Sequence, residues 1–533
     1  MERATKHLGF SVLECADVLR MTVNGHLDPK RRSQMGQFMT PAPVAKFMAS
    51  LFADAPELEV RLLDPGAAVG SLTAAFVENM FSKARRPRRI KVAAYEVEPI
   101  LINRLVTTLD ECCAAGKSYG IEFTGEIVKE DFIHAGCAIL RDELPPGQKQ
   151  IRHFTHIIIN PPYKKIRSDS EYRKELRSVG IETANLYTAF LAISIKLLSE
   201  HGELVAIVPR SFCNGLYFRP FRNLLLGSMA LKHIHVFHSR KQAFKDDDVL
   251  QENIIFHAVK GAIPKRVAIT ASKGPDFDDM TIREVDYCQV VKADDPEHFI
   301  HIAAIESDQE VMDRMARFNH TLEDLGIGVS TGPVVDFRLR NFLVDRPEKG
   351  TVPLIYTAHF DGNIVRWPRE DCRKPNAIRL ADSVRKWLMP NGCYVVTKRF
   401  SAKEERRRIV AAIHDEKRVP GELVGFENHL NVFHARGKGL PLILAGGLAV
   451  FLNSTLVDQY FRIFSGHTQV NATDLRKIPY PSVVELEALG RKIGPQFPNQ
   501  AEVDRIIEDT IVRGGRGKLS ARKCLDGSSR IQT

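Results

Sequence analysis

The segment Asn160-Pro161-Pro162-Tyr163 has the clearest chemical meaning in this chain. It follows a short apolar run, residues 156–159, which indicates a buried strand that stops abruptly. The two prolines have no N–H and a fixed φ, so the loop is stiff and holds the Asn160 side-chain oxygen and the Pro161 carbonyl in place. Two acceptors directed at one point, beside the flat face of Tyr163, suit a planar ring that carries an NH2 group. Taken alone, the motif could also be a proline-rich turn after a core strand.

Three earlier strand candidates also end in residues that suit a nucleoside ligand. The first leads into the turn of residues 64–71 (DPGAAVGS), whose small residues let the backbone approach a ligand closely. Glu96 ends the second strand, at a position where a carboxylate commonly accepts both hydroxyls of a ribose. After the third strand, Asp131 could accept from an adenine amino group while Phe132 packs on the ring. The first turn could instead be a tight turn of any α/β protein, and Glu96 a solvated helix cap, but four such signals at four successive strand ends favour a nucleoside site.

A regular alternation of strand and helix patterns would position these motifs. It is typical of a doubly wound α/β sheet whose strands are mostly parallel, and ligands bind beyond the carboxyl ends of such strands. The predicted strands are residues 61–64, 90–96, 121–129, 155–160, 204–208, 231–237 and 253–259. The predicted helices include residues 71–82, 99–114, 185–199 and 218–226.

The alternation fades after about residue 262, where the chain begins to mix short strands, loops and helices without a detectable repeat. We therefore expect an N-terminal helical segment, an α/β domain, a second domain and a tail. These regions are residues 1–32, 33–265, 300–510 and 513–533. The tail is basic, rich in Gly and Ser and poor in large apolar residues, which is typical of disorder.

The composition excludes several classes of protein. With 44% hydrophobic and 26% charged residues the chain resembles an ordinary globular protein, and no apolar run approaches the roughly 20 residues that span a bilayer. Nine cysteines without a C-x-x-C pair argue for reduced thiols in a cytosol, and against a zinc ribbon or a disulfide framework. The net charge of +10 and the pI of about 9.1 favour a polyanionic partner. We expect neither a metal nor a membrane contact.

The order of the motifs resembles that of a known family, the gamma-class adenine-N6 DNA methyltransferases of restriction–modification systems. In that class the cofactor motifs come first, NPPY follows, and the target-recognition domain comes last. Four further stretches resemble the PstI/BsuBI-type branch: residues 207–212 (IVPRSF), 332–338 (GPVVDFR), 465–471 (SGHTQVN) and 474–481 (DLRKIPYP). The resemblance implies a Rossmann-like methyltransferase sheet with an antiparallel hairpin, followed by a C-terminal α+β target-recognition domain.

The resemblance implies S-adenosyl-L-methionine as the cofactor of the α/β domain. The residues that would hold it are Thr40, Pro41, Asp64, Gly66, Gly70, Glu96, Asp131 and Phe132. The first five would contact its methionine end, Glu96 the ribose, and the last two the adenine. The glycine loop of the family usually has Gly where this chain has Ala68. If that position needs a positive φ, alanine costs roughly 1 kcal/mol there.

The resemblance also implies double-stranded DNA as the substrate, with the target adenine flipped out of the helix. Tyr163 and Phe244 would stack on the flipped base, although Phe244 could instead be a core residue before the final hairpin. Hydrogen bonds from the adenine NH2 to Asn160 and Pro161 would free the nitrogen lone pair for attack on the methyl group. Candidate DNA contacts, which could instead be solvated surface, are Lys164, Lys165, Lys398, Arg399 and residues 406–408.

The PstI/BsuBI branch implies a short palindromic site that contains adenine, with CTGCAG as the candidate, a cognate restriction endonuclease, and a place in the bacterial cytoplasm. One rival is an N-methyltransferase of a protein glutamine amide or of RNA, since NPPY occurs there too, usually in shorter chains. Cytosine-N4 enzymes usually have Ser in place of Asn160. The other rival is a non-catalytic DNA-binding protein on the same fold.

Overall fold

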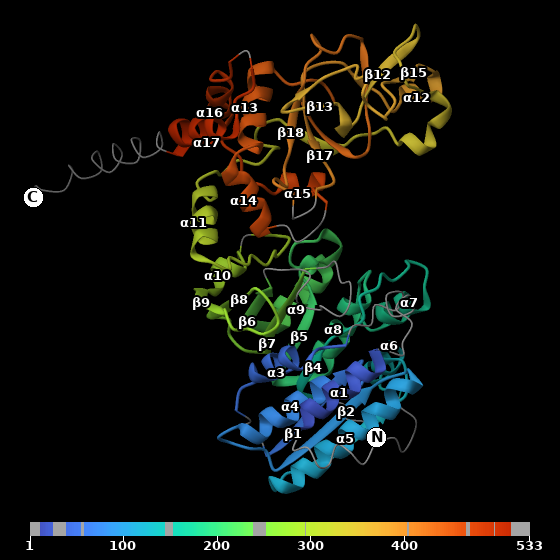
Figure 1. The fold of residues 1–533 in the computed structure, drawn as a ribbon, viewed down its shortest axis with the longest axis vertical. Coiled ribbons are helices and arrows are strands. Elements are labelled where there is room, and N and C mark those ends of the chain that lie inside the picture. The colour runs from blue at the N-terminus through green and yellow to red at the C-terminus, as the bar shows by residue number, and fades with distance from the viewer. Residues whose placement is uncertain are drawn as a thin grey trace, which may run out of the picture. The chain divides into compact units, whose positions relative to one another are not determined.

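The computed structural model describes residues 11–24, 39–54, 58–143, 153–237, 252–293, 295–401, 405–464, 469–494 and 496–512. The chain forms two compact units, Met1–Ala304 and Ile305–Thr533 (Figure 1). Phe244 and the expected tail, residues 513–533, lie outside the described residues. The expected N-terminal segment is described only for residues 11–24, where helix α1 (Val12–Asn24) lies.

A nine-stranded sheet forms the centre of the first unit. Its strands are β1 (Glu59–Pro65), β2 (Arg89–Tyr95), β3 (Glu122–Val128), β4 (Phe154–Ile159), β5 (Leu198–Pro209), β6 (Met229–Phe237), β7 (Asn253–Lys260), β8 (Arg266–Ser272) and β9 (Thr281–Asp286). They follow the order β3-β2-β1-β4-β5-β7-β6-β8-β9. The strands from β3 to β5 are parallel, whereas β7 is antiparallel to both neighbours. The predicted doubly wound, mostly parallel sheet with an antiparallel hairpin is confirmed.

Helices pack on both faces of this sheet. They are α1, α3 (Ala42–Ser50), α4 (Ser71–Ser82), α5 (Pro99–Ser118), α6 (Phe132–Leu140), α7 (Glu171–Ser178), α8 (Leu186–Leu197), α9 (Arg219–Ser228) and α10 (Tyr287–Val290). Because side chains alternate between the faces of a strand, Leu62 packs with residues of α1, α3, α4 and α5, and Leu63 with residues of α6, α8 and α9. Burial on both faces explains why β4 is buried along its whole length and is mostly apolar.

The sheet continues beyond the limit at residue 265 that the sequence suggested for the first domain. Strand β8 pairs in parallel with β6, and β9 pairs antiparallel with β8. The expected limit therefore falls between two strands of one sheet, and the first unit runs to Ala304. The alternation of strands and helices gave no sign of this extension, because no helix separates β7, β8 and β9.

The second unit is α+β, as predicted. Its strands are β10 (Gly328–Thr331), β11 (Leu343–Val344), β12 (Thr351–Ile355), β13 (Phe360–Asp361), β14 (Ile364–Val365), β15 (Ala377–Arg379), β16 (Met389–Pro390), β17 (Tyr394–Lys398), β18 (Ala411–His414), β19 (Leu423–Phe426) and β20 (Leu430–His434). They form a six-stranded sheet, β10-β20-β17-β18-β14-β13, and a five-stranded sheet, β11-β15-β12-β19-β16.

The helices of the second unit lie mainly at its two sequence ends. They are α11 (Glu306–Met315), α12 (Asp382–Arg385), α13 (Leu442–Leu452), α14 (Thr455–Phe464), α15 (Ala472–Arg476), α16 (Val483–Gly490) and α17 (Gln500–Ile507). Among the described helices of the whole chain, none is by itself long and apolar enough to cross a membrane. One pair, Leu442–Leu452 with Thr455–Ile463, meets that criterion jointly and is bent by 57°.

Candidate active site

Asn160, directly after β4, is held by residues from distant parts of the chain. Its Nδ2 donates a hydrogen bond to Thr40 Oγ1 at 3.0 Å. Its Oδ1 accepts from the Tyr163 hydroxyl at 3.2 Å, and that hydroxyl also lies 3.2 Å from the Ile207 carbonyl oxygen. The structure thus brings Thr40 and Asn160 together and fixes the direction of the amide.

The Tyr163 ring is half-buried beside the core of the first unit. It meets the Tyr187 ring in a T-shaped contact, with the ring centroids 6.2 Å apart. Burial raises the pKa of Tyr163 well above its usual value, so the hydroxyl stays protonated and remains a donor to Asn160. Its phenol therefore helps to fix the amide, a role that the sequence did not suggest.

The turn after β1 has three residues with positive φ: Gly66 at 85°, Ala68 at 50° and Gly70 at 87°. A side chain at Gly70 would be strained and would place its Cβ 2.8 Å from Leu105 Cδ1, so glycine is required there. At Gly66 a Cβ would meet only the Phe190 ring, at 4.0 Å, so the positive φ is what favours glycine. The sequence raised the possibility that position 68 needs a positive φ, and the structure places Ala68 in that strained conformation.

Glu96, at the end of β2, is bonded to this turn. Its Oε2 accepts from the Ala68 N–H at 2.9 Å, and its Oε1 accepts from the N–H groups of Val97 and Glu98 at 2.8 and 2.9 Å. Burial raises the pKa of Glu96, although these three N–H groups act in the opposite direction. The carboxylate is therefore fixed in position between the ends of β1 and β2.

Asp64 lies at the carboxyl end of β1 and is fully buried. Its Oδ2 accepts from Thr73 Oγ1 at 2.7 Å, whereas its Oδ1 is buried without a partner among the described residues. Burial raises the pKa of Asp64 to about 7. An unpaired buried carboxylate oxygen costs free energy, and a ligand with a positive charge or an N–H donor would recover it.

Asp131 forms the N-cap of α6. Its Oδ1 accepts from the N–H groups of Ile133 and His134 at 2.9 and 3.3 Å, and its Oδ2 accepts from the Tyr172 hydroxyl at 2.7 Å. Tyr172 belongs to α7 and was not identified from the sequence, since no local pattern relates it to Asp131. The neighbouring Phe132 is 3% exposed and packs against Tyr95 and Phe190.

The basic candidates differ in their surroundings. Lys164 and Lys165 are exposed after the NPPY motif, whereas Lys398 and Arg399 are half-buried at the end of β17. The expectation that residues 406–408 contact DNA is wrong for Arg408, the last of them. Arg408 is fully buried and donates from Nε to Ser401 Oγ at 3.2 Å, while its backbone N–H donates to Asp458 Oδ1 at 2.6 Å. Arg407 donates to the Ser454 carbonyl.

Known proteins are similar to this chain in sequence and in fold. The family model described as Eco57I restriction-modification methylase matches residues 103–244. Type II methyltransferase M.BsuBI of Bacillus subtilis is 44% identical over 504 residues, which cover 94% of this chain and 98% of the relative. Type II methyltransferase M.PstI of Providencia stuartii is 42% identical over 513 residues, which cover 96% of this chain and 99% of that relative. The chain belongs to this family of type II DNA methyltransferases.

The solved structure of the type IIL restriction-modification enzyme MmeI in complex with DNA matches at a TM-score of 0.50 and 11% identity, and covers 93% of this chain and 73% of that one. It supports the fold alone. A type II methyltransferase uses S-adenosyl-L-methionine, which supplies an electrophilic methyl group on a sulfonium. The described site fits this cofactor, because the unpaired Asp64 oxygen suits a cationic group.

Position 68 of this methyltransferase allows a direct test of the strained turn. We expect Ala68→Gly to change the thermal midpoint little, because relief of about 1 kcal/mol of backbone strain is offset by a similar entropy gain of the unfolded chain. Ala68→Val should lower stability by more than about 1 kcal/mol, because a β-branched residue tolerates positive φ poorly. Thermal unfolding and cofactor titration test both variants, and a tenfold gain in cofactor affinity for Ala68→Gly would contradict the view that alanine is tolerated.

Proposed function

We propose that this methyltransferase transfers the methyl group to N6 of adenine in a short palindromic duplex site, with CTGCAG as the first site to test. The observation that carries the proposal is the Asn160 amide, whose direction is fixed by Thr40 and Tyr163 at the end of β4. Its oxygen and the Pro161 carbonyl would accept the two hydrogens of an exocyclic NH2 group. Pro162 stiffens the loop that carries them.

The proposed mechanism needs the target base outside the helix, since N6 inside a duplex cannot reach a buried methyl donor. The Tyr163 ring would stack on the flipped adenine and recover part of the cost of unstacking. The two acceptors would favour a pyramidal nitrogen with a freer lone pair, directed in line at the methyl carbon. Much of the rate would come from this positioning. The amine loses its proton only after the methyl group has been transferred, so a strong base before attack is unnecessary.

The cofactor would occupy the carboxyl ends of β1, β2 and β3. The proposed contacts are Thr40, Pro41, Asp64, Gly66 and Gly70 for the methionine end, Glu96 for the ribose, and Asp131 with Phe132 for the adenine. Asp64 would pair with the positively charged end through its unpaired oxygen. Glu96 is held by three backbone N–H groups and would accept from hydroxyl groups. Tyr172 would hold the Asp131 carboxylate in position.

The experiment that tests this function uses tritiated S-adenosyl-L-methionine, the purified protein and unmethylated bacteriophage DNA, followed by nucleoside analysis. Label in N6-methyladenine is the expected result, and mapping the label would identify the site. Label in N4-methylcytosine, or in a protein or RNA fraction, would show that the substrate is not adenine in DNA. Cofactor binding without transfer to any fraction would instead support a non-catalytic DNA-binding protein.

The proposed partners are double-stranded DNA and a cognate restriction endonuclease in a bacterial cytoplasm. The exposed Lys164 and Lys165, next to the NPPY motif, would contact phosphates beside the flipped base. Methylated DNA should resist an endonuclease that cuts at the same site, and DNA binding should weaken steeply with salt. Cleavage of fully methylated DNA at the mapped site would contradict the protective role.

A further inference from the structure

A pocket of about 350 Å³ lies in the second unit, in the region expected to recognise DNA. Lys374, Lys398, Phe400 and His429 are among the residues that line it, together with Tyr356 and Glu427. Phe400 is 45% exposed, and its ring centroid lies 5.0 Å from that of His429. Thr357 and a second carboxylate, Glu405, complete the lining, so the pocket combines two lysines, two carboxylates, an imidazole and aromatic rings. Such a mixture of donors and acceptors suits the edge of a base pair better than a phosphate.

His429 is oriented by Glu427. The Glu427 carboxylate is 1% exposed and is bonded through one oxygen to Nδ1 of the imidazole and through the other to the His429 N–H, at 3.0 Å. The tautomer that donates from Nδ1 to this carboxylate leaves Nε2 as an acceptor. Since the imidazole is 49% exposed, this acceptor is available to a ligand in the pocket.

The two lysines supply donors. Of the carboxylates that the structure describes, none lies within ion-pair distance of the Lys398 ammonium. The Lys374 Nζ lies 3.3 Å from Asp336 Oδ2 and 5.1 Å from the centre of the Tyr356 ring, so its position is restrained from two sides. Lys374 and Lys398 line the same pocket as His429.

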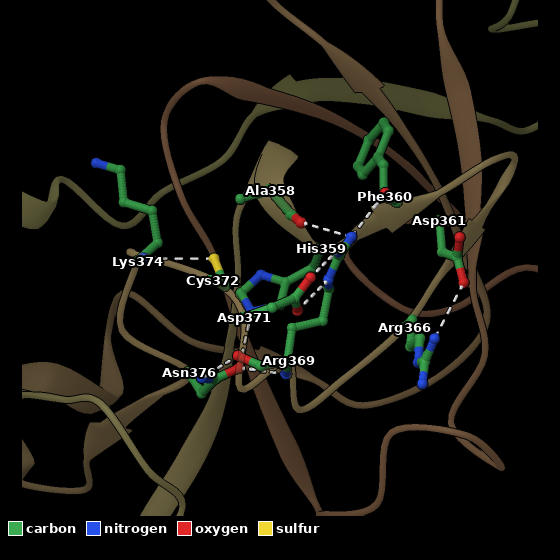
Figure 2. A network of polar contacts seen from close by, with 10 residues as sticks. All are labelled: Ala358, His359, Phe360, Asp361, Arg366, Arg369, Asp371, Cys372, Lys374 and Asn376. Carbon is green, nitrogen blue, oxygen red and sulfur yellow. Dashed lines mark hydrogen bonds and ion pairs between the residues drawn. The ribbon is translucent and has the colours of Figure 1, made fainter.

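The loop that carries Lys374 is braced by the network in Figure 2. Arg369 donates to both oxygens of Asp371, at 3.1 and 2.6 Å, and to the Ala358 and Phe360 carbonyls. Asn376 Oδ1 accepts from the Arg369 N–H at 2.8 Å and lies 3.0 Å from His359 Nε2. A braced loop presents its lysine at one place, which base recognition requires and diffuse phosphate attraction does not.

One buried polar atom of a residue that lines the pocket, the Tyr356 hydroxyl, has no partner among the described residues, and the same holds for Arg399 Nε and Asn428 Oδ1. Tyr356 lines the pocket, while Arg399 and Asn428 adjoin its lining residues in the sequence. Buried polar groups are normally hydrogen-bonded, so the unpaired Tyr356 hydroxyl suits a polar ligand in the pocket.

We propose that this pocket reads one G·C base pair through the major groove. In that groove a G·C pair presents two adjacent acceptors, guanine N7 and O6, and then one donor, the cytosine N4 amino group. The two ammonium groups of Lys374 and Lys398 match the acceptors, and Nε2 of His429 matches the donor. An A·T pair presents a different order of groups together with a methyl group. This inference rests on the proposed function, because it takes duplex DNA as the substrate.

The test compares kcat/KM on a set of duplexes in which each base pair of the mapped site is replaced in turn. Wild type, Lys398→Ala and His429→Ala are compared, with Lys417→Ala as an exposed lysine control outside the pocket. We expect each pocket variant to lose discrimination at one G·C pair by about 5- to 150-fold and to keep it at the other positions. The affinity for the cofactor should stay at the wild-type value.

Other results would overturn the inference. A uniform loss on every duplex, with a salt slope reduced by about one, would make the lysine a phosphate contact. An unaltered discrimination profile would also overturn it. Lys398→Gln replaces the alanine variant if that variant has a lowered thermal midpoint. Absence of wild-type transfer to any DNA would reject the proposed function together with this inference, whereas wild-type transfer with unchanged variant profiles rejects the inference alone.

Discussion

Replacing Asn160 with alanine is expected to lower kcat by at least about 10²- to 10³-fold while the Kd for S-adenosyl-L-methionine changes by less than about threefold. The amide oxygen would contact the target base rather than the cofactor, and its direction is fixed by Thr40 and Tyr163. Truncation removes this acceptor and the hydrogen bond to Thr40, but leaves the proposed cofactor contacts at the ends of β1 and β2 in place. Single-turnover transfer of tritium and calorimetric titration measure the two quantities separately.

Asn103→Ala, at an exposed position of α5, is the matched control for this experiment and should behave as the wild type. Tyr163→Phe adds a second control within the site, because it removes the hydroxyl that donates to Asn160 but keeps the ring. It should reduce kcat less than Asn160→Ala does. Turnover of Asn160→Ala comparable to that of the wild type would contradict the mechanism.

Asp64→Asn is expected to have opposite effects on stability and on cofactor binding. The asparagine amide can still accept from Thr73. The substitution also removes the buried negative charge of Asp64, whose Oδ1 atom has no partner among the described residues. At pH 8 we expect a gain of about 1–3 kcal/mol in unfolding free energy, because relief of the desolvation penalty exceeds the cost of one buried NH2 group. Cofactor affinity should fall by about 10- to 150-fold, the value of a charge-assisted hydrogen bond.

The stabilisation by Asp64→Asn should depend on pH, because it follows the ionisation of the Asp64 carboxyl. The folded-state pKa of Asp64 is raised to about 7, above the value of about 3.9 in an unfolded chain. The protonated carboxyl therefore contributes stability that is fully present below about pH 4 and is lost as the pH rises to about 7 and above. Asp64→Asn should be most stabilising at pH 8 and nearly neutral at pH 4. A stabilisation that is independent of pH, or an unchanged cofactor affinity, would contradict this assignment.

The parts of the site that the sequence revealed lie at the ends of buried strands. Continuous apolar runs and the small-residue turn identified the positions of Asp64, Glu96, Asp131 and Asn160, because burial on both faces of a sheet leaves a strong local pattern. The structure places all four at the carboxyl ends of β1 to β4 or just beyond them. Local pattern was therefore sufficient to place these candidate residues at the strand ends.

The parts that the sequence did not reveal depend on contacts between distant residues. Tyr172 reaches Asp131 across 41 positions, and that contact depends on the path of the chain through α7. Arg408 looked like a surface cation, but it is buried beside Ser401 and Asp458. A run of three arginines has the same local pattern whether it faces DNA or packs inside the second unit. Tertiary partners, rather than composition, decide such cases.

The two strands added to the sheet after β7 have a consequence for the solubility of shortened forms of this protein. Strand β9 closes the sheet with Arg283, Glu284 and Asp286, and charges on an outer strand oppose pairing with another molecule. A chain cut at residue 265 would lose β8 and β9, so β6 would become an unpaired edge strand. Its buried residues include Ile234 and Val236, and an exposed apolar edge strand promotes aggregation. A cut after Ala304 keeps the charged border and should remain monodisperse.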